Sequence, residues 1–272
     1  MADRNLTTRR LWGQFMTREG MMLYIPADDD FSMDSIPQTI DFHRKSTVQE
    51  FPLGSRLMWG ERVFRYYKND AVADVAGNLY QMEVPVAGHI DEALDEPVAG
   101  ATVVSFTPTT TNIDADEYVN GYFYINDDTG EGYMHRVKSH GAITAAVAGN
   151  ITLYDPIVVT LGALATGTLL NSPYRAPIIT AVPPTALEVG FAQAAVAASG
   201  FGWLCVSGPT PALTNGTLVI DDSVMASDAV AGAVEDWALA VATPDAEITR
   251  AIGVCMAVNA DTEYSAVWAL VS

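Results

Sequence analysis

The feature that most constrains the fold is a two-residue alternation of apolar and polar side chains in short segments separated by turn residues. In residues 118–125, YVNGYFYI, Phe123 and Ile125 share one face, as in a half-buried β-strand. Residues 132–138, GYMHRVK, repeat this alternation. The connecting NDDTGE, residues 126–131, supplies the Asn, Asp and Gly residues that favour tight turns. The pattern predicts an antiparallel hairpin.

Similar short segments recur along the chain and contain many Val, Thr and aromatic residues. Because 49% of the residues are hydrophobic, the chain can bury a sizeable core. The fold class that we expect is mainly β, with one or more antiparallel β-sandwich or barrel-like domains. Further strands are predicted at residues 78–84, 101–106, 151–161 (two strands broken at Asp155-Pro156), 176–182, 201–207, 217–220, 236–242, 251–258 and 264–271.

Two stretches in the second half of the chain do not follow this pattern. Residues 187–200 fit either a strand pair or a short Ala-rich helix. The run GPTPALTNG, residues 208–216, contains two prolines and reads as a turn region. Residues 189–220 carry no charge, but Gly, Ser, Gln, Pro and Asn interrupt them, which predicts strands and loops and not a membrane span.

Charge divides the chain unevenly. Residues 1–68 contain ten cations and nine acids, a net charge of +1, whereas residues 69–272 contain four cations and 24 acids, a net charge of −20. An acidic body repels nucleic acid and anionic membranes, so we expect neither as a partner. The front of the chain is better suited to docking on another protein.

The front of the chain is also irregular in sequence. It holds six of the ten Met residues and many aromatic residues, and prolines interrupt it repeatedly. Residues 11–16 favour one short amphipathic helix. We therefore predict an extended N-terminal arm at residues 1–71, a first β-rich region at 72–182 and a second at 183–272, leaving open whether the two β-rich regions form one domain. The opening MADRNLTTRR lacks the apolar core of a secretory signal.

A search for catalytic and metal-binding patterns finds none, so we expect neither an enzyme, nor a cofactor, nor a metal site. Asp127, Asp128 and Glu131 offer oxygen ligands, but their spacing differs from that of a calcium-binding EF-hand loop. Cys205 and Cys255 lie in separate apolar runs, which predicts buried free thiols.

Several phrases of the sequence resemble those of phage virion proteins. NDDTGEGYMHRVKSH followed by ITLYDPIVVTL looks like virion proteins found beside capsid genes. The stretch GWLCVSGPTPALTNGTLVIDDSVMASDAVAGAV, with IGVCMAV and YSAVWALV after it, is similar to small β-rich capsid decoration, or cement, proteins. The resemblance covers roughly residues 72–272. It implies a late structural protein, made in the host cytoplasm, that binds the major capsid protein on the outside of the virion, often as a homotrimer.

Docking residues are expected in the arm and on one strand. Two alternatives stay open: a receptor- or glycan-binding head or tail fibre module that uses Tyr118, Tyr122 and Tyr124, and the major capsid protein itself. Arg136 and Lys138 form a small basic spot on one strand face of an acidic body, which we expect to be a subunit contact that serves oligomerisation or docking. The candidate partner-binding residues are Arg9, Arg10, Leu11, Trp12, Phe15, Tyr24, Phe31, Arg136 and Lys138.

Overall fold

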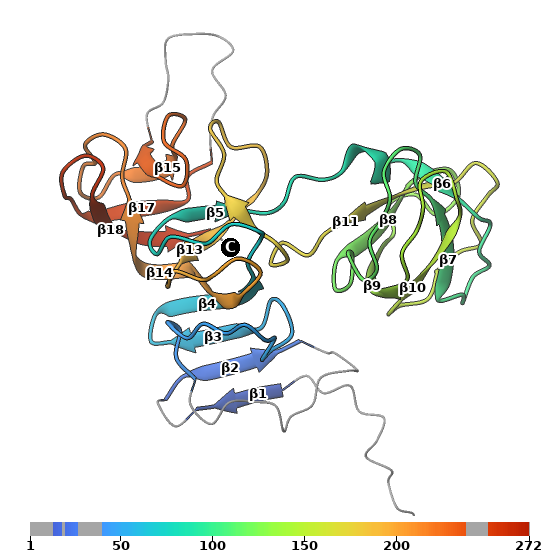
Figure 1. The fold of residues 1–272 in the computed structure, drawn as a ribbon, viewed down its shortest axis with the longest axis horizontal. Helices are drawn as coiled ribbons and strands as arrows, with labels where there is room; N and C mark the ends of the chain where they lie inside the picture. The colour runs from blue at the N-terminus through green and yellow to red at the C-terminus, as the bar shows by residue number, and fades with distance from the viewer. Residues whose placement is uncertain (1–12, 18–19, 27–39, 238–249, 272) are drawn as a thin grey trace, which may run out of the picture. The chain divides into compact units, whose positions relative to one another are not determined.

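The computed structural model describes residues 13–17, 20–26, 40–237 and 250–271, and it divides the chain into two compact units (Figure 1). Unit 1 comprises residues 1–83 and 173–272, and unit 2 is the continuous segment Val84–Ser172. The prediction of a mainly β fold is confirmed, with 41% strand, 1% helix, antiparallel sheets and a six-stranded barrel. No helix in the described ranges is long and apolar enough to cross a membrane.

Unit 1 is built on one twelve-stranded sheet. Its main path runs in the order β1-β2-β3-β4-β14-β18-β17-β15-β16, and β5, β12 and β13 join it through β14 (Figure 1). The strands are β1 (Gly13–Met16), β2 (Met22–Ile25), β3 (Arg56–Trp59), β4 (Arg62–Lys68), β5 (Leu79–Gln81), β12 (Ile178–Ile179), β13 (Glu188–Ala192), β14 (Phe201–Leu213), β15 (Ser223–Ala226), β16 (Val234–Asp236), β17 (Gly253–Ala257) and β18 (Tyr264–Leu270).

The core of unit 1 joins the two pieces of its chain. β14 pairs with β4 from the first piece and with β18 from the second. Trp203 on β14 packs against Phe51 and Tyr66, with ring centroids 5.4 and 5.1 Å away, and all three side chains are at most 2% exposed. Aromatic rings that bury this much area contribute strongly to a core. Neither piece can therefore complete the core alone.

Unit 2 is a closed barrel in the order β10-β7-β6-β11-β8-β9. Alternate residues point inward, so that Phe106, Phe123, Val137 and Leu169 are fully buried in a core made only from this unit. Closure leaves the barrel no strand edge to protect. Its elements are the 3₁₀ helix η3 (Ala87–His89) and the strands β6 (Glu92–Leu94), β7 (Val103–Thr107), β8 (Tyr122–Asp127), β9 (Met134–His140), β10 (Gly149–Leu153) and β11 (Thr166–Leu170).

The predicted hairpin around NDDTGE is confirmed. β8 and β9 pair antiparallel, with Phe123 opposite His135. Asp128 adopts a φ of 63° and Gly130 a φ of 97°, which are left-handed conformations that turns require. Asp128 Oδ1 and Oδ2 accept hydrogen bonds from Thr129 Oγ1 and from the Leu164 N–H at 3.5 and 3.3 Å. The side chain of Asp128 therefore helps to shape the turn.

The expected extended arm differs from the structure where the structure describes it. Residues 13–16 form strand β1 and not the amphipathic helix expected at 11–16, and β2, β3 and β4 extend the large sheet. The unit boundaries also differ from those expected, since 72–182 is divided between the units. The reason is long-range pairing: β4 gains its partner β14 about 140 residues later in the chain, which local patterns do not reveal.

Several predicted segments change in length or type. Residues 208–213 are not a turn but the second half of β14, paired with β18. Pro209 and Pro211 are two residues apart, so the two positions without an N–H group lie on the same side of β14. That side faces β4, but β4 pairs only with residues 201–207, so neither proline interrupts this pairing. Residues 187–200 form β13 and turns, with no helix, and no strand forms at 157–161 or 217–220.

Candidate functional site

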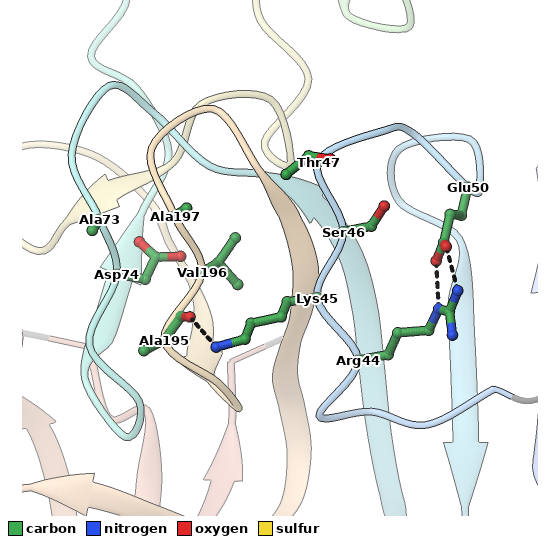
Figure 2. Close-up of a pocket in the computed structure, with 10 residues that line it drawn as sticks. All are labelled: Arg44, Lys45, Ser46, Thr47, Glu50, Ala73, Asp74, Ala195, Val196 and Ala197. Carbon is green, nitrogen blue, oxygen red and sulfur yellow. Dashed lines mark hydrogen bonds and ion pairs between the residues drawn. The ribbon is translucent and has the colours of Figure 1, made fainter.

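A pocket of about 540 Å³ lies in unit 1 between three loops (Figure 2). The first loop runs over residues 44–50, the second contains Ala73 and Asp74, and the third contains residues 195–197. Apolar Ala and Val side chains line one part of the pocket, and charged side chains line the rest, as in many small-molecule or peptide sites. The lining residues are Arg44, Lys45, Ser46, Thr47, Glu50, Ala73, Asp74, Ala195, Val196 and Ala197.

Hydrogen bonds hold the loops around the pocket in place. Asn69 Nδ2 donates to the carbonyl oxygens of Val72, Val196 and Ala197 at 2.7, 3.2 and 3.2 Å, which ties the second loop to the third. Lys45 Nζ donates to the carbonyl oxygen of Ala195 at 3.3 Å, across the pocket (Figure 2). These contacts indicate a preformed pocket.

Arg44 and Glu50 on the first loop neutralise each other. Arg44 donates two hydrogen bonds to the carboxylate of Glu50, from Nε at 2.7 Å and from Nη2 at 2.5 Å (Figure 2). This forked geometry is the strongest form of arginine–carboxylate pairing. The Glu50 N–H in turn donates to the Tyr66 hydroxyl at 3.0 Å, which anchors the loop to the core. Arg44 is therefore a structural cation.

Asp74 is the one buried carboxyl group of the pocket, with 4% of the residue exposed. Burial raises the pKa of Asp74 to about 6, and hydrogen bonds with Tyr67 and Tyr80 oppose that rise. The Tyr67 hydroxyl donates to Asp74 Oδ2, and burial raises the pKa of Tyr67, so this phenol remains a donor. Asp74 can exchange a proton near neutral pH.

The lining residues do not assemble a nucleophile with a general base. The Ser46 hydroxyl donates to the carbonyl oxygen of Val48 at 2.7 Å and is therefore engaged in its own loop. Within the described ranges, no group of three His, Cys, Asp or Glu side chains is placed to hold a metal ion. The pocket is chemically suited to holding a polar group of a partner.

The cysteines and His135 are buried groups outside the pocket. Cys205 and Cys255 are buried free thiols, as predicted, and burial raises the pKa of both. His135 is 3% exposed inside the barrel, and both of its ring nitrogens lack a hydrogen-bond partner. Burial lowers the pKa of His135, so the ring is neutral at neutral pH.

Two of the predicted arm residues, Phe15 and Tyr24, lie within the described ranges. Arg9, Arg10, Leu11, Trp12 and Phe31 lie outside the described residues. The backbone of Phe15 belongs to β1 and pairs with Leu23 of β2. Tyr24 lies on β2, half-buried, and its hydroxyl lies 3.0 Å from Met22 Sδ.

Arg136 and Lys138 share the outer face of β9, as predicted from the alternation. Both lie over the ring of Tyr154, with Arg136 Cζ at 5.4 Å and Lys138 Nζ at 5.7 Å from its centroid. Arg136 Nη2 also donates to Asn120 Oδ1 at 2.8 Å. The unit contains eleven acids and only these two Lys or Arg residues, so its positive charge is confined to this cluster.

The three-tyrosine face expected for glycan stacking is not present as predicted. Tyr122 is 39% exposed, but Tyr118 is 1% exposed. The Tyr118 residue precedes β8, and its hydroxyl bonds to His89 Nδ1 at 2.5 Å inside the barrel. The strand begins four residues later than expected, because residues 115–120 form turns in which Asp116 and Asn120 have positive φ angles.

Sequence reasoning missed a pair of arginines on the β3–β4 hairpin. Arg56 and Arg65 are direct cross-strand partners, because the two-residue loop Gly60-Glu61 fixes the register. Two short strand-like runs on either side of this loop, RLMW and RVFRYYK, contained the signal. Tyr24 is the neighbour of Arg56 on β2.

The described residues thus form three candidate functional features: the pocket in unit 1, the Arg56 and Arg65 pair, and the Arg136 and Lys138 cluster on the barrel. No family model, curated protein or solved structure matches the chain.

Proposed function

We propose that this chain is a phage virion structural protein without catalytic activity that binds the outer surface of the capsid and stabilises the shell. Its partners are the major capsid protein and further copies of itself, in a homotrimer. The protein is made in the host cytoplasm and ends on the exterior of the virion. The sequence phrases that resemble decoration proteins support this proposal.

The observation that carries the proposal is the way unit 1 incorporates the front of the chain, which holds ten of the fourteen Lys and Arg residues. β1, β2, β3 and β4 form one end of the large sheet, and β1 is the terminal strand of the sheet order. Arg9, Arg10, Leu11 and Trp12 directly precede β1 in sequence. An edge strand offers unpaired backbone groups to a partner, and an adjacent apolar and cationic segment adds contact area.

The charge distribution suits such a role. A net charge of −19 keeps copies soluble and mutually repelling before they dock. Apolar contacts then supply roughly 25 cal/mol for each Å² of buried surface along an extended footprint. Binding only to the assembled shell stabilises the shell by mass action.

Deletion of residues 2–12 tests the proposal, because it removes the expected docking residues and leaves β1 intact. The purified protein is mixed with expanded, DNA-free shells that lack it, and its occupancy is measured by co-sedimentation and density maps. We expect the full chain to occupy the shells and the deletion variant to lose at least about tenfold in affinity.

A longer deletion, to residue 35, is a poor substitute. It would remove Leu23 and Ile25, which are at most 3% exposed in the core of unit 1, and would therefore unfold part of the sheet. Failure of the full chain to bind shells would contradict the proposal. Full occupancy by the shorter deletion variant would contradict the role of the arm.

Self-association has its own test in the barrel. Arg136→Glu with Lys138→Glu reverses both cations over Tyr154, and we expect the variant to weaken the homotrimer by about tenfold or more in dissociation constant. Analytical ultracentrifugation measures the change. An unchanged oligomer would remove these residues from the subunit contact.

The alternative function, a glycan-binding head or tail fibre module, rests on Tyr122 and Tyr124 of β8. Its support is weaker, because Tyr118 is buried and cannot stack on a sugar. A glycan array separates the alternatives: binding that is lost in Tyr122→Ala would favour the glycan module.

A further inference from the structure

We infer that the face of β2, β3 and β4 that carries Arg56 and Arg65 is a docking site for an acidic segment of a different protein, which under the proposed function is the shell subunit. This inference rests on the proposed function for the identity of the partner. It rests on the geometry of the arginine pair for the chemistry of recognition.

The two arginines face the same side of the sheet. Direct antiparallel partners have Cβ atoms about 5 Å apart, and like charges in that position are destabilising. The pair is Arg56 and Arg65, fixed by the register in which Leu57 pairs with Phe64. Repulsion between the two cations therefore opposes the stability that their other contacts give the isolated chain.

The guanidinium groups are incompletely satisfied. In both arginines Nε is buried and has no hydrogen-bond partner. Arg65 Nη1 donates to the carbonyl oxygen of Gly54 at 3.1 Å, and neither arginine forms an ion pair within the described ranges. A buried donor without an acceptor costs free energy. Because the Nε atoms are buried, a partner carboxylate would accept hydrogen bonds from the terminal Nη atoms of the two guanidinium groups.

The surroundings are those of a protein interface. Arg56 Cζ lies 5.9 Å from the centroid of Tyr24, and Arg65 Cζ lies 5.7 Å from that of Tyr174. Met22 on β2 and Met58 on β3 are cross-strand partners near the pair of Tyr24 and Arg56, and both are half-buried. Tyr, Met and Arg are the residue types enriched where proteins dock, and Met adapts its shape to a partner.

The charge pattern favours an acidic protein over the other possible occupants. A second copy docked by twofold symmetry would bring four arginines together. Nucleic acid binding needs many phosphate contacts, which two arginines on a chain of net charge −19 do not provide. An acidic segment with an apolar side chain complements both the arginines and the Met and Tyr residues.

The test compares the full chain with Arg56→Gln/Arg65→Gln. We expect the double variant to bind shells at least about tenfold more weakly, and to have a Tm equal to or higher than that of the parent, because a repulsive pair is removed. Arg56→Lys/Arg65→Lys keeps the positive charge but loses the two parallel N–H groups of each guanidinium. Its affinity for shells should lie between those of the Gln variant and the parent.

A matched control is available on the barrel. Thr144→Glu/Ala148→Glu makes the same change in net charge as the Gln pair at two exposed positions, and should bind shells as the parent does. A lowered Tm in the Gln variant would show that the arginines serve folding, and would overturn the inference.

A second probe separates this inference from the proposed function. A fluorescent peptide of alternating Glu and Leu should bind the full chain and lose affinity in the Gln variant, measured by anisotropy at low and high salt. If the parent binds shells and the Gln variant binds them equally well, the inference fails and the proposed function stands. If the parent binds the peptide and not shells, the proposed function fails and the docking face for an acidic segment stands.

Two further outcomes would overturn the inference. One is a DNA oligonucleotide that competes better than the acidic peptide. The other is self-association of the parent that the Gln pair abolishes, which would make a second copy the occupant.

Discussion

Units 1 and 2 are both antiparallel β structures, but they treat their strand edges in opposite ways. Unit 2 is one continuous segment that closes six strands into a barrel. Unit 1 combines two distant pieces of chain in a sheet whose order runs from β1 to β16 without closing. A closed barrel satisfies its own backbone, whereas the ends of an open sheet remain available for pairing. Under the proposed function, the surface that docks on the shell therefore belongs to unit 1.

The two units also differ in how they hold their few cations. Unit 2 keeps Arg136 and Lys138 together over one aromatic ring. In unit 1, Arg44 is neutralised by Glu50, whereas Arg56 and Arg65 face each other with buried Nε groups that lack acceptors. An ion pair therefore distinguishes Arg44, which stabilises its own loop, from Arg56 and Arg65, whose charges no carboxylate within the described ranges neutralises.

The largest expected effect comes from separating the units. A fragment of residues 84–172 should fold alone, because its core is formed only from that segment. A fragment of residues 173–272 should remain unfolded, because β14 would lose β4. Thermal unfolding followed by circular dichroism and the chemical-shift dispersion of NMR spectra show whether each fragment is folded. An unfolded barrel fragment would show that the barrel depends on unit 1 for its stability.

Core truncations should act on one unit at a time. Phe64→Ala in unit 1 and Phe123→Ala in unit 2 each remove a ring that is 0% exposed, and each should lower the free energy of unfolding of its own unit by about 3–5 kcal/mol. Calorimetry should show two transitions, with only one shifted in each variant. A single transition that moves equally in both would mean that the units unfold together.

Asp74 gives unit 1 a dependence on pH. Its folded pKa of about 6 lies above the ordinary value of 3.8, so the folded unit retains the proton longer, and stability falls as pH rises from about 4 to 6. Asp74→Asn should therefore stabilise unit 1 by about 1–2 kcal/mol at pH 7.5, with partial solvent screening included. Urea unfolding from pH 4 to 8 measures the difference in the free energy of unfolding between Asp74→Asn and the parent, which should vanish at pH 4.

His135 gives unit 2 the opposite and smallest pH response. Its folded pKa lies below the ordinary value of 6.5, so the unfolded chain takes up the proton first, and stability falls as pH drops below 6.5. His135→Leu should flatten this decline in the thermal unfolding of the barrel. His89 and His140 are present in both proteins, so their contribution cancels. A decline that is equally steep in the Leu variant would exclude His135 as its source.

The contrast between the two units also explains how much of the fold could be predicted from the sequence. The β8–β9 hairpin followed from alternation and turn chemistry, because both strands and the turn lie within about twenty residues. The pairing of β4 with β14 did not follow, because nothing local marks a partner so far along the chain. Pro209 and Pro211 led to the prediction of a turn for a related reason. A strand accepts them here only because the pairing of β4 ends before them, which the local sequence does not show.

The candidate sites were predictable to a similar degree. Arg136 and Lys138 were assigned correctly to one strand face from the two-residue period. The pocket was not, since it brings together loops near residues 47, 74 and 196. Arg56 and Arg65 lay within reach of prediction, because the Gly60-Glu61 loop sets their register, but their unsatisfied Nε groups become visible only with packing.

The way in which the barrel is connected to unit 1 has a consequence for engineering. The barrel segment leaves unit 1 after Glu83 and returns at Pro173, and the flanking residues Gln81 and Ile178 are cross-strand partners on β5 and β12. The two attachment points are thus held near each other by unit 1 itself. The barrel can therefore be treated as an exchangeable cassette, and another domain with adjacent termini could be displayed in its place.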